Sequence, residues 1–216
     1  IKSEPLFILK SILKAGMLFG SNKMNPIYDM LKSYAQSDRK RYCMPGHKGS
    51  NELFKYDVTE LLSTDDLYSP SGAIKEAEKL FSKEYKKDVL FSPFGSTGCI
   101  GAMLMEFKGK RVLFDRAVHK NVINYIALFD IVPVFVEPEF KDGIVKTVST
   151  EKIAEVLESD KSIEAVFIAG VNYFGYVCDY EGIAKVCKQY NVFFMVDNAH
   201  GAYFMVFDKR LHPSSY

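Results

Sequence analysis

The sequence has few cysteines and almost no net charge. Its four cysteines form no Cys-x-x-Cys pair and lie among apolar residues, which is typical of reduced thiols in a cytoplasmic protein and argues against a disulfide framework. The 28 lysines and arginines balance the 27 aspartates and glutamates. This balance gives no electrostatic preference for nucleic acid or an anionic membrane surface, so we expect neither as a partner.

Long apolar runs are also missing. The nearest approach, residues 1–23, contains Lys10 and Lys14, is too short and too charged to span a bilayer, and precedes no small-residue cleavage site. We therefore expect no membrane span, and we expect residues 1–23 to be either an extraneous segment or an amphipathic arm.

What the sequence does contain is a regular alternation of two patterns. With 48% hydrophobic residues in a chain of 216, it can bury a sizeable core. Short apolar runs rich in Val, Ile and Phe predict buried strands, and the stretches between them predict helices. The predicted strands cover residues 88–94, 111–115, 131–138, 164–170 and 192–197, and the predicted helices cover residues 97–107, 119–129, 150–159 and 180–190. This alternation predicts an α/β domain with a mostly parallel sheet and helices on both faces.

The expected domain occupies residues 88–216, and its third predicted helix is capped by Ser149 or Thr150. We expect residues 24–87 to form an N-terminal arm with loops that lead into the domain. Within this arm, Asn25 and Pro26 make a good cap and first turn for a helix over residues 27–36.

Polar residues follow three of the apolar runs. Gly95, Ser96 and Thr97 come after the first run at the entrance to a helix, His119 follows the second run, and Asp197 ends the fifth. In open α/β sheets ligands bind beyond the carboxyl ends of the strands, so these are candidate site residues. Exposed amides at a helix start and two hydroxyls predict a phosphate site, although a simple capped helix start has the same residue types.

Asp197 carries the strongest functional prediction. A carboxylate at the end of a buried apolar run is costly to desolvate unless a cation or strong donors meet it. It is therefore either a helix cap or loop anchor, or a buried group that pairs with a protonated nitrogen of a ligand. His119 is likewise either a structural histidine or a member of the same site.

A phosphate cradle, an imidazole and a carboxylate at strand ends together fit pyridoxal 5'-phosphate. The alternative is a metal site, with Asp115 and His119 or Asp197 and His200 as ligands. The Gly95–Thr97 turn has no role in a metal site, and no glutamate stands with these histidines in an HExxH-like spacing. The cofactor is therefore favoured, and no metal is expected.

An ordered set of motifs over residues 40–213 resembles the major domain of the Orn/Lys/Arg decarboxylase family. The set comprises MPGHKGS, DVTELLSTDDLYSPSGAIKEAEKL, GSTGCIGAML, DRAVHKNV, NYFGYVCDYEGIAKV and VDNAHGAY. The family consists of fold-type I pyridoxal phosphate enzymes that act on basic amino acids. The resemblance implies a three-layer, aminotransferase-like large domain, a lysine, ornithine or arginine substrate, and a homodimer or larger assembly.

The resemblance also implies roles for individual residues. The residues implied to contact the cofactor are Gly95, Ser96, Thr97, His119, Asp197, Ala199 and His200. Two of these are implied to be catalytic, since His119 stacks on the ring and Asp197 pairs with the pyridine nitrogen.

The sequence departs from the family pattern in three places. Residues 170–175 read GVNYFG where the family has SPTYYG, so the contact expected of the threonine falls to Asn172 or is lost. Asn198 stands where a glutamate is common, and Tyr203 where a histidine is frequent. These changes are mild and indicate a subgroup.

A further departure concerns the family's Schiff-base lysine, which lies in a Ser-x-His-Lys motif that the 216 residues do not contain. We therefore expect a fragment that is inactive alone. In the implied fold, strands beyond Asp197 insert beside residues 88–94, so this run is expected to lack its sheet partners.

The alternatives to a decarboxylase fragment are a non-catalytic product of a disrupted gene and another fold-type I enzyme such as an aminotransferase. The sequence does not distinguish among lysine, ornithine and arginine as substrates. The residues that contact the distal amine or guanidinium group are expected mostly outside these 216 residues or in a partner subunit.

Overall fold

The computed structural model describes residues 25–216, so the expectations for residues 1–23 lie outside the described residues. The chain divides into two compact units, Ile1–Phe91 and Ser92–Tyr216, which are described separately. The domain boundary expected at residue 88 stays a prediction. In the part of the chain that the structure describes, no helix is both long enough and apolar enough to cross a membrane.

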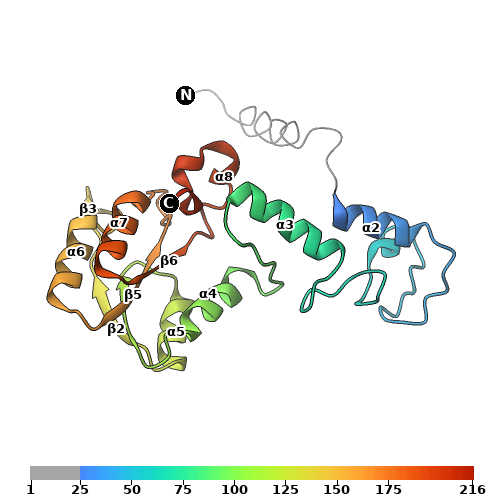
Figure 1. Ribbon diagram of the computed structural model, residues 1–216, viewed down its shortest axis with the longest axis horizontal. Helices are drawn as coiled ribbons and strands as arrows, with labels where there is room; N and C mark the ends of the chain where they lie inside the picture. Colours follow the sequence, from blue (N-terminus) through green and yellow to red (C-terminus); the bar gives the residue numbers. More distant parts are fainter. Residues whose placement is uncertain (1–24) are drawn as a thin grey trace. The chain divides into compact units, whose positions relative to one another are not determined.

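The second unit contains the predicted parallel sheet (Figure 1). Its strands run in the order β2-β1-β5-β6, and all neighbouring pairs are parallel. Their bounds are β1 Arg111–Asp115, β2 Val132–Val136, β5 Ile163–Ala169 and β6 Phe193–Asp197. Four of the five predicted strands are therefore confirmed, each to within two residues at either end.

The four predicted helices of this unit are also present. They are α4 Gly95–Met105, α5 Lys120–Leu128, α6 Thr150–Ser159 and α7 Tyr180–Tyr190. The Ser149 hydroxyl caps α6 by accepting from the Lys152 amide, as predicted. Two further features were not predicted from the sequence. They are a hairpin of two short strands, β3 Phe140–Lys141 and β4 Ile144–Val145, and a short helix α8, Phe204–Phe207.

Helices cover both faces of the sheet, because the central strands are apolar on both sides. Along β1, Val112 and Phe114 pack with residues of α4 and α5, whereas Leu113 packs with residues of α6 and α7. All three side chains are fully buried. Side chains of a strand alternate between its two faces, so a continuous apolar run produces two cores and three layers (Figure 1).

The prediction of a strand over residues 88–94 is wrong. No regular structure forms there, and the described sheet ends on β2 and β6. Two backbone amides of this run donate to side chains of the preceding helix rather than to a neighbouring strand. The Val89 amide donates to Ser82 Oγ at 3.0 Å, and the Phe91 amide donates to Glu78 Oε1 at 3.0 Å. An apolar run without strand neighbours is thus extended along a helix rather than paired.

The first unit has more helix than the predicted arm and loops. Its elements are α2 Pro26–Ala35, a 3-10 turn η1 Phe54–Tyr56, and α3 Ala73–Tyr85. The helix α2 was predicted, and the Asn25 side chain caps it by accepting from the Tyr28 amide. The helix α3 was not predicted, and the expectation of loops is wrong there.

The MPGHKGS motif forms a tight turn in the first unit. His47 Nε2 lies 3.0 Å from Asp57 Oδ2, and its Nδ1 accepts from the Gly49 amide at 3.0 Å. Its ring stacks on Phe54 with the ring centroids 4.3 Å apart. Accepting at Nδ1 leaves the ring proton on Nε2, so the Nε2–H group donates to the Asp57 carboxylate.

The start of α3 is capped by a residue far from it in sequence. The carboxylate of Asp65 accepts from the amides of Ser71, Gly72 and Ile74 at 2.9, 3.0 and 2.8 Å. No side chain at the cap position itself can do this, because that residue is Gly72. Burial alone would raise the pKa of Asp65, but hydrogen bonds from backbone amides outweigh it and lower the pKa to about 2.

We predict that Asp65 stabilises the first unit above about pH 4 and loses this effect in acid. A lowered folded-state pKa means that the contribution is complete above the unfolded value of about 3.9 and disappears as the pH falls through about 2. Urea unfolding of the parent and of Asp65→Asn should differ most near pH 5 and converge towards pH 2. Asp66→Asn is the matched control, since the Asp66 side chain accepts from the Tyr68 amide at 2.9 Å and not from the amides at the start of α3. A parent-to-variant difference that does not change with pH would exclude this role.

Candidate functional site

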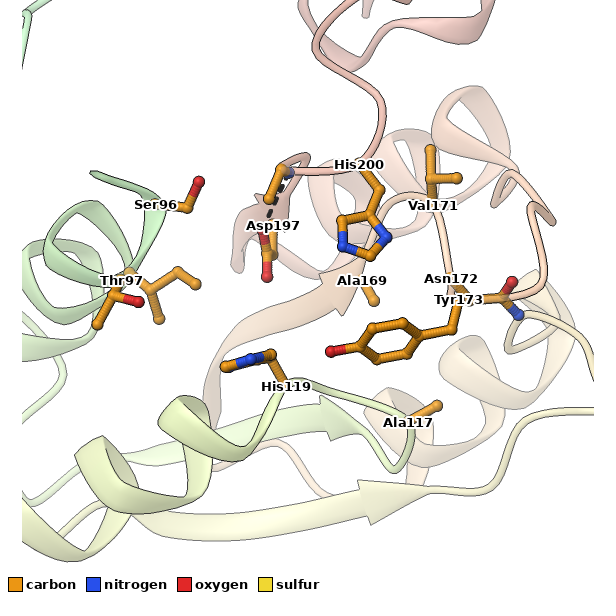
Figure 2. Close-up of a pocket in the computed structure, with 12 residues that line it drawn as sticks. Ser96, Thr97, Ala117, His119, Ala169, Val171, Asn172, Tyr173, Asp197 and His200 are labelled. Atoms are coloured by element: carbon orange, nitrogen blue, oxygen red, sulfur yellow. Dashed lines mark hydrogen bonds between the residues drawn. The ribbon is translucent and has the colours of Figure 1, made fainter.

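A pocket of about 180 Å³ lies at the carboxyl ends of β1, β5 and β6 (Figure 2). Six of the seven sequence-predicted site residues line it, and they are Ser96, Thr97, His119, Asp197, Ala199 and His200. The seventh, Gly95, begins the helix that carries Ser96 and Thr97. Parallel strands bring their carboxyl ends to one edge of the sheet, and this edge assembles residues as far apart in sequence as Ser96 and His200.

The first turn of α4 forms one wall of the pocket. Gly95 has a φ of +61°, and a Cβ atom there would meet nothing within 4 Å. The glycine is therefore required by its backbone conformation and not by a close approach. No side chain caps α4, and Ser96 and Thr97 are exposed residues that line the pocket. Uncapped amides and the helix dipole give this wall a partial positive charge.

His119 lies at the start of α5 and caps that helix. Its Nδ1 accepts from the Asn121 amide at 3.2 Å, so this nitrogen carries no proton. The ring is half-buried and faces the pocket from the β1 side (Figure 2). His119 therefore both caps α5 and lines the pocket. The cap uses only Nδ1, so the face of the ring remains available to a ligand.

Asp197 ends β6 with its carboxylate directed into the pocket (Figure 2). One oxygen, Oδ1, accepts from the Ala199 amide at 3.1 Å, whereas Oδ2 makes no hydrogen bond to the described residues. The side chain is partly exposed, so the prediction of a buried carboxylate is wrong. The loop contact fixes the direction of the carboxylate and leaves one oxygen available to a ligand.

Asp115 lies beneath the pocket at the end of β1 and is 2% exposed. It accepts hydrogen bonds from the amides of Ala117, at 2.8 Å, and Ala169, and both of these residues line the pocket. Burial raises the pKa of Asp115, and the two amides oppose this shift. Asp115 thus supports the pocket floor.

The metal alternative finds no support in the arrangement of these side chains. Within residues 25–216, no group of three or more His, Cys, Asp and Glu side chains is placed to hold an ion. Asp115, which the alternative pairs with His119, faces backbone amides instead.

Asn172 stands in the GVNYFG segment, where the family has a threonine that is expected to contact the cofactor. Its Nδ2 donates to the carbonyls of Val145 and Lys146 at 2.9 and 3.0 Å, and its Oδ1 accepts from the amides of Phe174 and Tyr176 at 2.9 and 3.1 Å. Both donors and both acceptor positions are used, and the side chain points away from the pocket (Figure 2). Asn172 lines the pocket, but its side chain has no hydrogen-bonding position left for the contact expected of the family's threonine.

Tyr173 is a pocket residue that the sequence analysis missed. Its ring is 67% exposed and meets His200 edge-to-face, with centroids 5.1 Å apart. The hydroxyl points into the pocket towards His119 (Figure 2). Its position just after β5 was a usable signal, since the same argument selected residues after the other strands.

Comparison with known proteins identifies related sequences and folds. The family model for the Orn/Lys/Arg decarboxylase major domain matches residues 25–213. An arginine decarboxylase from Bacillus cereus is 28% identical over 85% of this chain and 44% of its own length. An arginine decarboxylase from Bacillus subtilis is 28% identical over 88% of this chain and 42% of its own length. The chain therefore spans less than half the length of these relatives.

Solved structures show the same fold. The constitutive lysine decarboxylase of E. coli superposes with a TM-score of 0.64 at 17% identity, over 81% of this chain and 28% of that protein. Lysine decarboxylase A from Pseudomonas aeruginosa gives a TM-score of 0.62 at 18% identity, over 86% of this chain and 29% of that protein.

The four hydrogen bonds of Asn172 predict a structural effect of its replacement. Asn172→Ala should lower the free energy of unfolding by about 1–3 kcal/mol, because buried backbone groups lose their partners. Asn172→Asp should cost more, since it places carboxylate oxygens against two carbonyls. Urea unfolding measures both effects, with Asn124→Ala as the control, because Asn124 is exposed and makes no side-chain hydrogen bond to the described residues. Equal stability of Asn172→Ala and the control would show that the segment does not depend on this side chain.

Proposed function

Because the chain belongs to the Orn/Lys/Arg decarboxylase family, we propose that it forms the cofactor-binding part of a pyridoxal phosphate-dependent decarboxylase of a basic amino acid. The observation that supports this most directly is the pocket at the sheet edge, where an uncapped helix start, an imidazole and a carboxylate meet. The family match supports the reaction class, and the pocket supports the cofactor.

The phosphate fits the wall formed by α4. The N-cap residue of α4 is Phe94, which has no side-chain acceptor, so the first amides of the helix lack a capping side chain and a phosphate can accept from them. The hydroxyls of Ser96 and Thr97 stand at the same end of the pocket as additional donors. A dianion is favoured here over a neutral group, because the helix dipole adds to the hydrogen bonds.

The ring fits the space between His119 and Asp197. When bound, pyridoxal phosphate withdraws electrons from the α-carbon of the substrate as its carboxylate leaves. Asp197 Oδ2 is available to accept from a protonated pyridine nitrogen, and its negative charge favours that protonated form. His119 offers the flat face of its ring, and its fixed Nδ1 keeps that face oriented. Ala199 anchors the aspartate, while His200 and Tyr173 border the open side.

The substrate is proposed as arginine, lysine or ornithine, and arginine is the first to test. Two Bacillus relatives that match 85% and 88% of this chain are named arginine decarboxylases. Lysine decarboxylase from E. coli strain K12 matches 52% of it at 23% identity. A homodimer or larger assembly in the cytoplasm belongs to the same proposal.

The proposed role of these residues is limited to non-covalent contacts with the cofactor. The 216 residues contain no Ser-x-His-Lys motif, so we assign covalent attachment to none of their lysines and expect residues 1–216 alone to release no carbon dioxide. The reaction class is therefore tested with the full-length gene product that contains these residues. With pyridoxal phosphate present, carbon dioxide release from arginine, lysine or ornithine supports the proposal.

In that assay we predict that Asp197→Ala is far more damaging than His119→Ala. The aspartate favours the protonated ring, on which electron withdrawal depends, whereas the imidazole mainly positions it. Because Asp197 is partly exposed, we expect a loss of roughly ten- to a thousandfold, equivalent to about 1.4–4 kcal/mol in the barrier. Rates are measured at saturating cofactor, and Asn124→Ala is the control. If Asp197→Ala keeps more than about a tenth of the parental rate, the assigned role is wrong.

A further inference from the structure

Asn121 lies in the first turn of α5 and makes hydrogen bonds to two residues that line the pocket, Thr97 and His119. The side chain is half-buried and is absent from the pocket lining. Its Nδ2 donates to Thr97 Oγ1 at 2.8 Å, and its backbone amide donates to His119 Nδ1 at 3.2 Å. One residue therefore connects the start of α4 to the start of α5, which are the two helix starts at the pocket.

The bond to Thr97 determines what the threonine hydroxyl can do. A hydroxyl has one proton and two lone pairs, and accepting from Asn121 uses one lone pair. The proton stays available, because the Thr97 hydroxyl donates to no group among the described residues. A hydroxyl held in this way is a donor directed at the pocket, where an uncapped helix start already favours an anion.

We propose that Asn121 is a positioning residue that orients the Thr97 hydroxyl as a donor, so that the pocket favours a ligand with a phosphate group over the same ligand without one. This inference rests on the proposed function, because it assigns the phosphate to the α4 end of the pocket. The inference goes beyond the proposed function, because it makes the preference for phosphate depend on Asn121, a side chain that does not line the pocket.

The proposal predicts losses of different size for two substitutions of Asn121. Asn121→Ala removes the amide and leaves the Thr97 hydroxyl free to rotate, so only part of the preference is lost. Asn121→Asp replaces the amide donor by a carboxylate. The carboxylate accepts a hydrogen bond from the Thr97 hydroxyl, so this hydroxyl no longer donates to the phosphate, and it adds a negative charge near the phosphate. The aspartate variant should therefore be the more damaging of the two.

The test compares two probes that lack an aldehyde, so that surface lysines cannot capture them. Pyridoxine 5'-phosphate and pyridoxine are titrated by calorimetry into the full chain, and the ratio of their dissociation constants measures the preference for phosphate. Asn121→Ala should reduce this ratio about three- to tenfold, the size of one hydrogen bond. Asn121→Asp should reduce it further, and Asn124→Ala, an exposed asparagine of the same helix, should leave it unchanged.

A double-mutant cycle separates positioning from a general structural effect. In a Thr97→Val background, Asn121→Ala should not change the ratio further, because the hydroxyl that it orients is gone. Independent, additive effects of the two substitutions would overturn the proposal. Asn121→Ser is the second variant if Asn121→Ala does not fold, since serine suits the first turn of a helix, and it should also reduce the ratio.

The outcomes distinguish this inference from the proposed function. A parent chain that binds both probes equally, or neither, contradicts the phosphate site itself and with it the proposed function. A parent that prefers pyridoxine 5'-phosphate, with the same preference in Asn121→Ala, contradicts only the role of Asn121.

Discussion

The candidate site depends on the parallel pairing of β1, β5 and β6. In this register Phe114 of β1 stands beside Phe167 of β5, and Ala169 of β5 stands beside Asp197 of β6. The carboxyl ends of the strands therefore reach the same edge, where the backbone is no longer occupied by sheet hydrogen bonds. A shift of one residue in either pair would turn the apolar side chains of β5 to the wrong core and move Asp197 away from the pocket.

The residues at this edge are held by hydrogen bonds that leave specific groups free. One carboxylate oxygen of Asp197 accepts from the Ala199 amide, and the other makes no hydrogen bond to the described residues. The Thr97 hydroxyl accepts from Asn121, and its proton remains available for donation. Asp115 supports the floor by accepting from two lining residues. The site is thus preorganised by partners that are mostly outside the pocket, which lowers the cost of orienting groups when a ligand binds.

Much of this arrangement could be predicted from the sequence, and the misses have physical reasons. The patterns of apolar residues located β1, α6 and α7 to the residue. Residues 88–94 have the composition of a strand, and composition alone predicted one there. The family resemblance implied that the run lacks its sheet partners, and without them no strand forms. The helix α3 was missed because its cap, Asp65, lies eight residues before its start. The roles of Asn172 and Asn121 depend on long-range contacts and cannot be read from local patterns.

The central claim is that Asp197 pairs with the ring nitrogen of a phosphate-bearing pyridine. The most direct measurement is the ¹⁵N chemical shift of ring-labelled pyridoxine 5'-phosphate bound to the chain, followed as the pH is raised. The account predicts that the bound nitrogen stays protonated at pH values where the free ligand has lost its proton, and that Asp197→Asn abolishes this difference. A bound nitrogen that titrates like the free ligand in the parent chain would contradict the account.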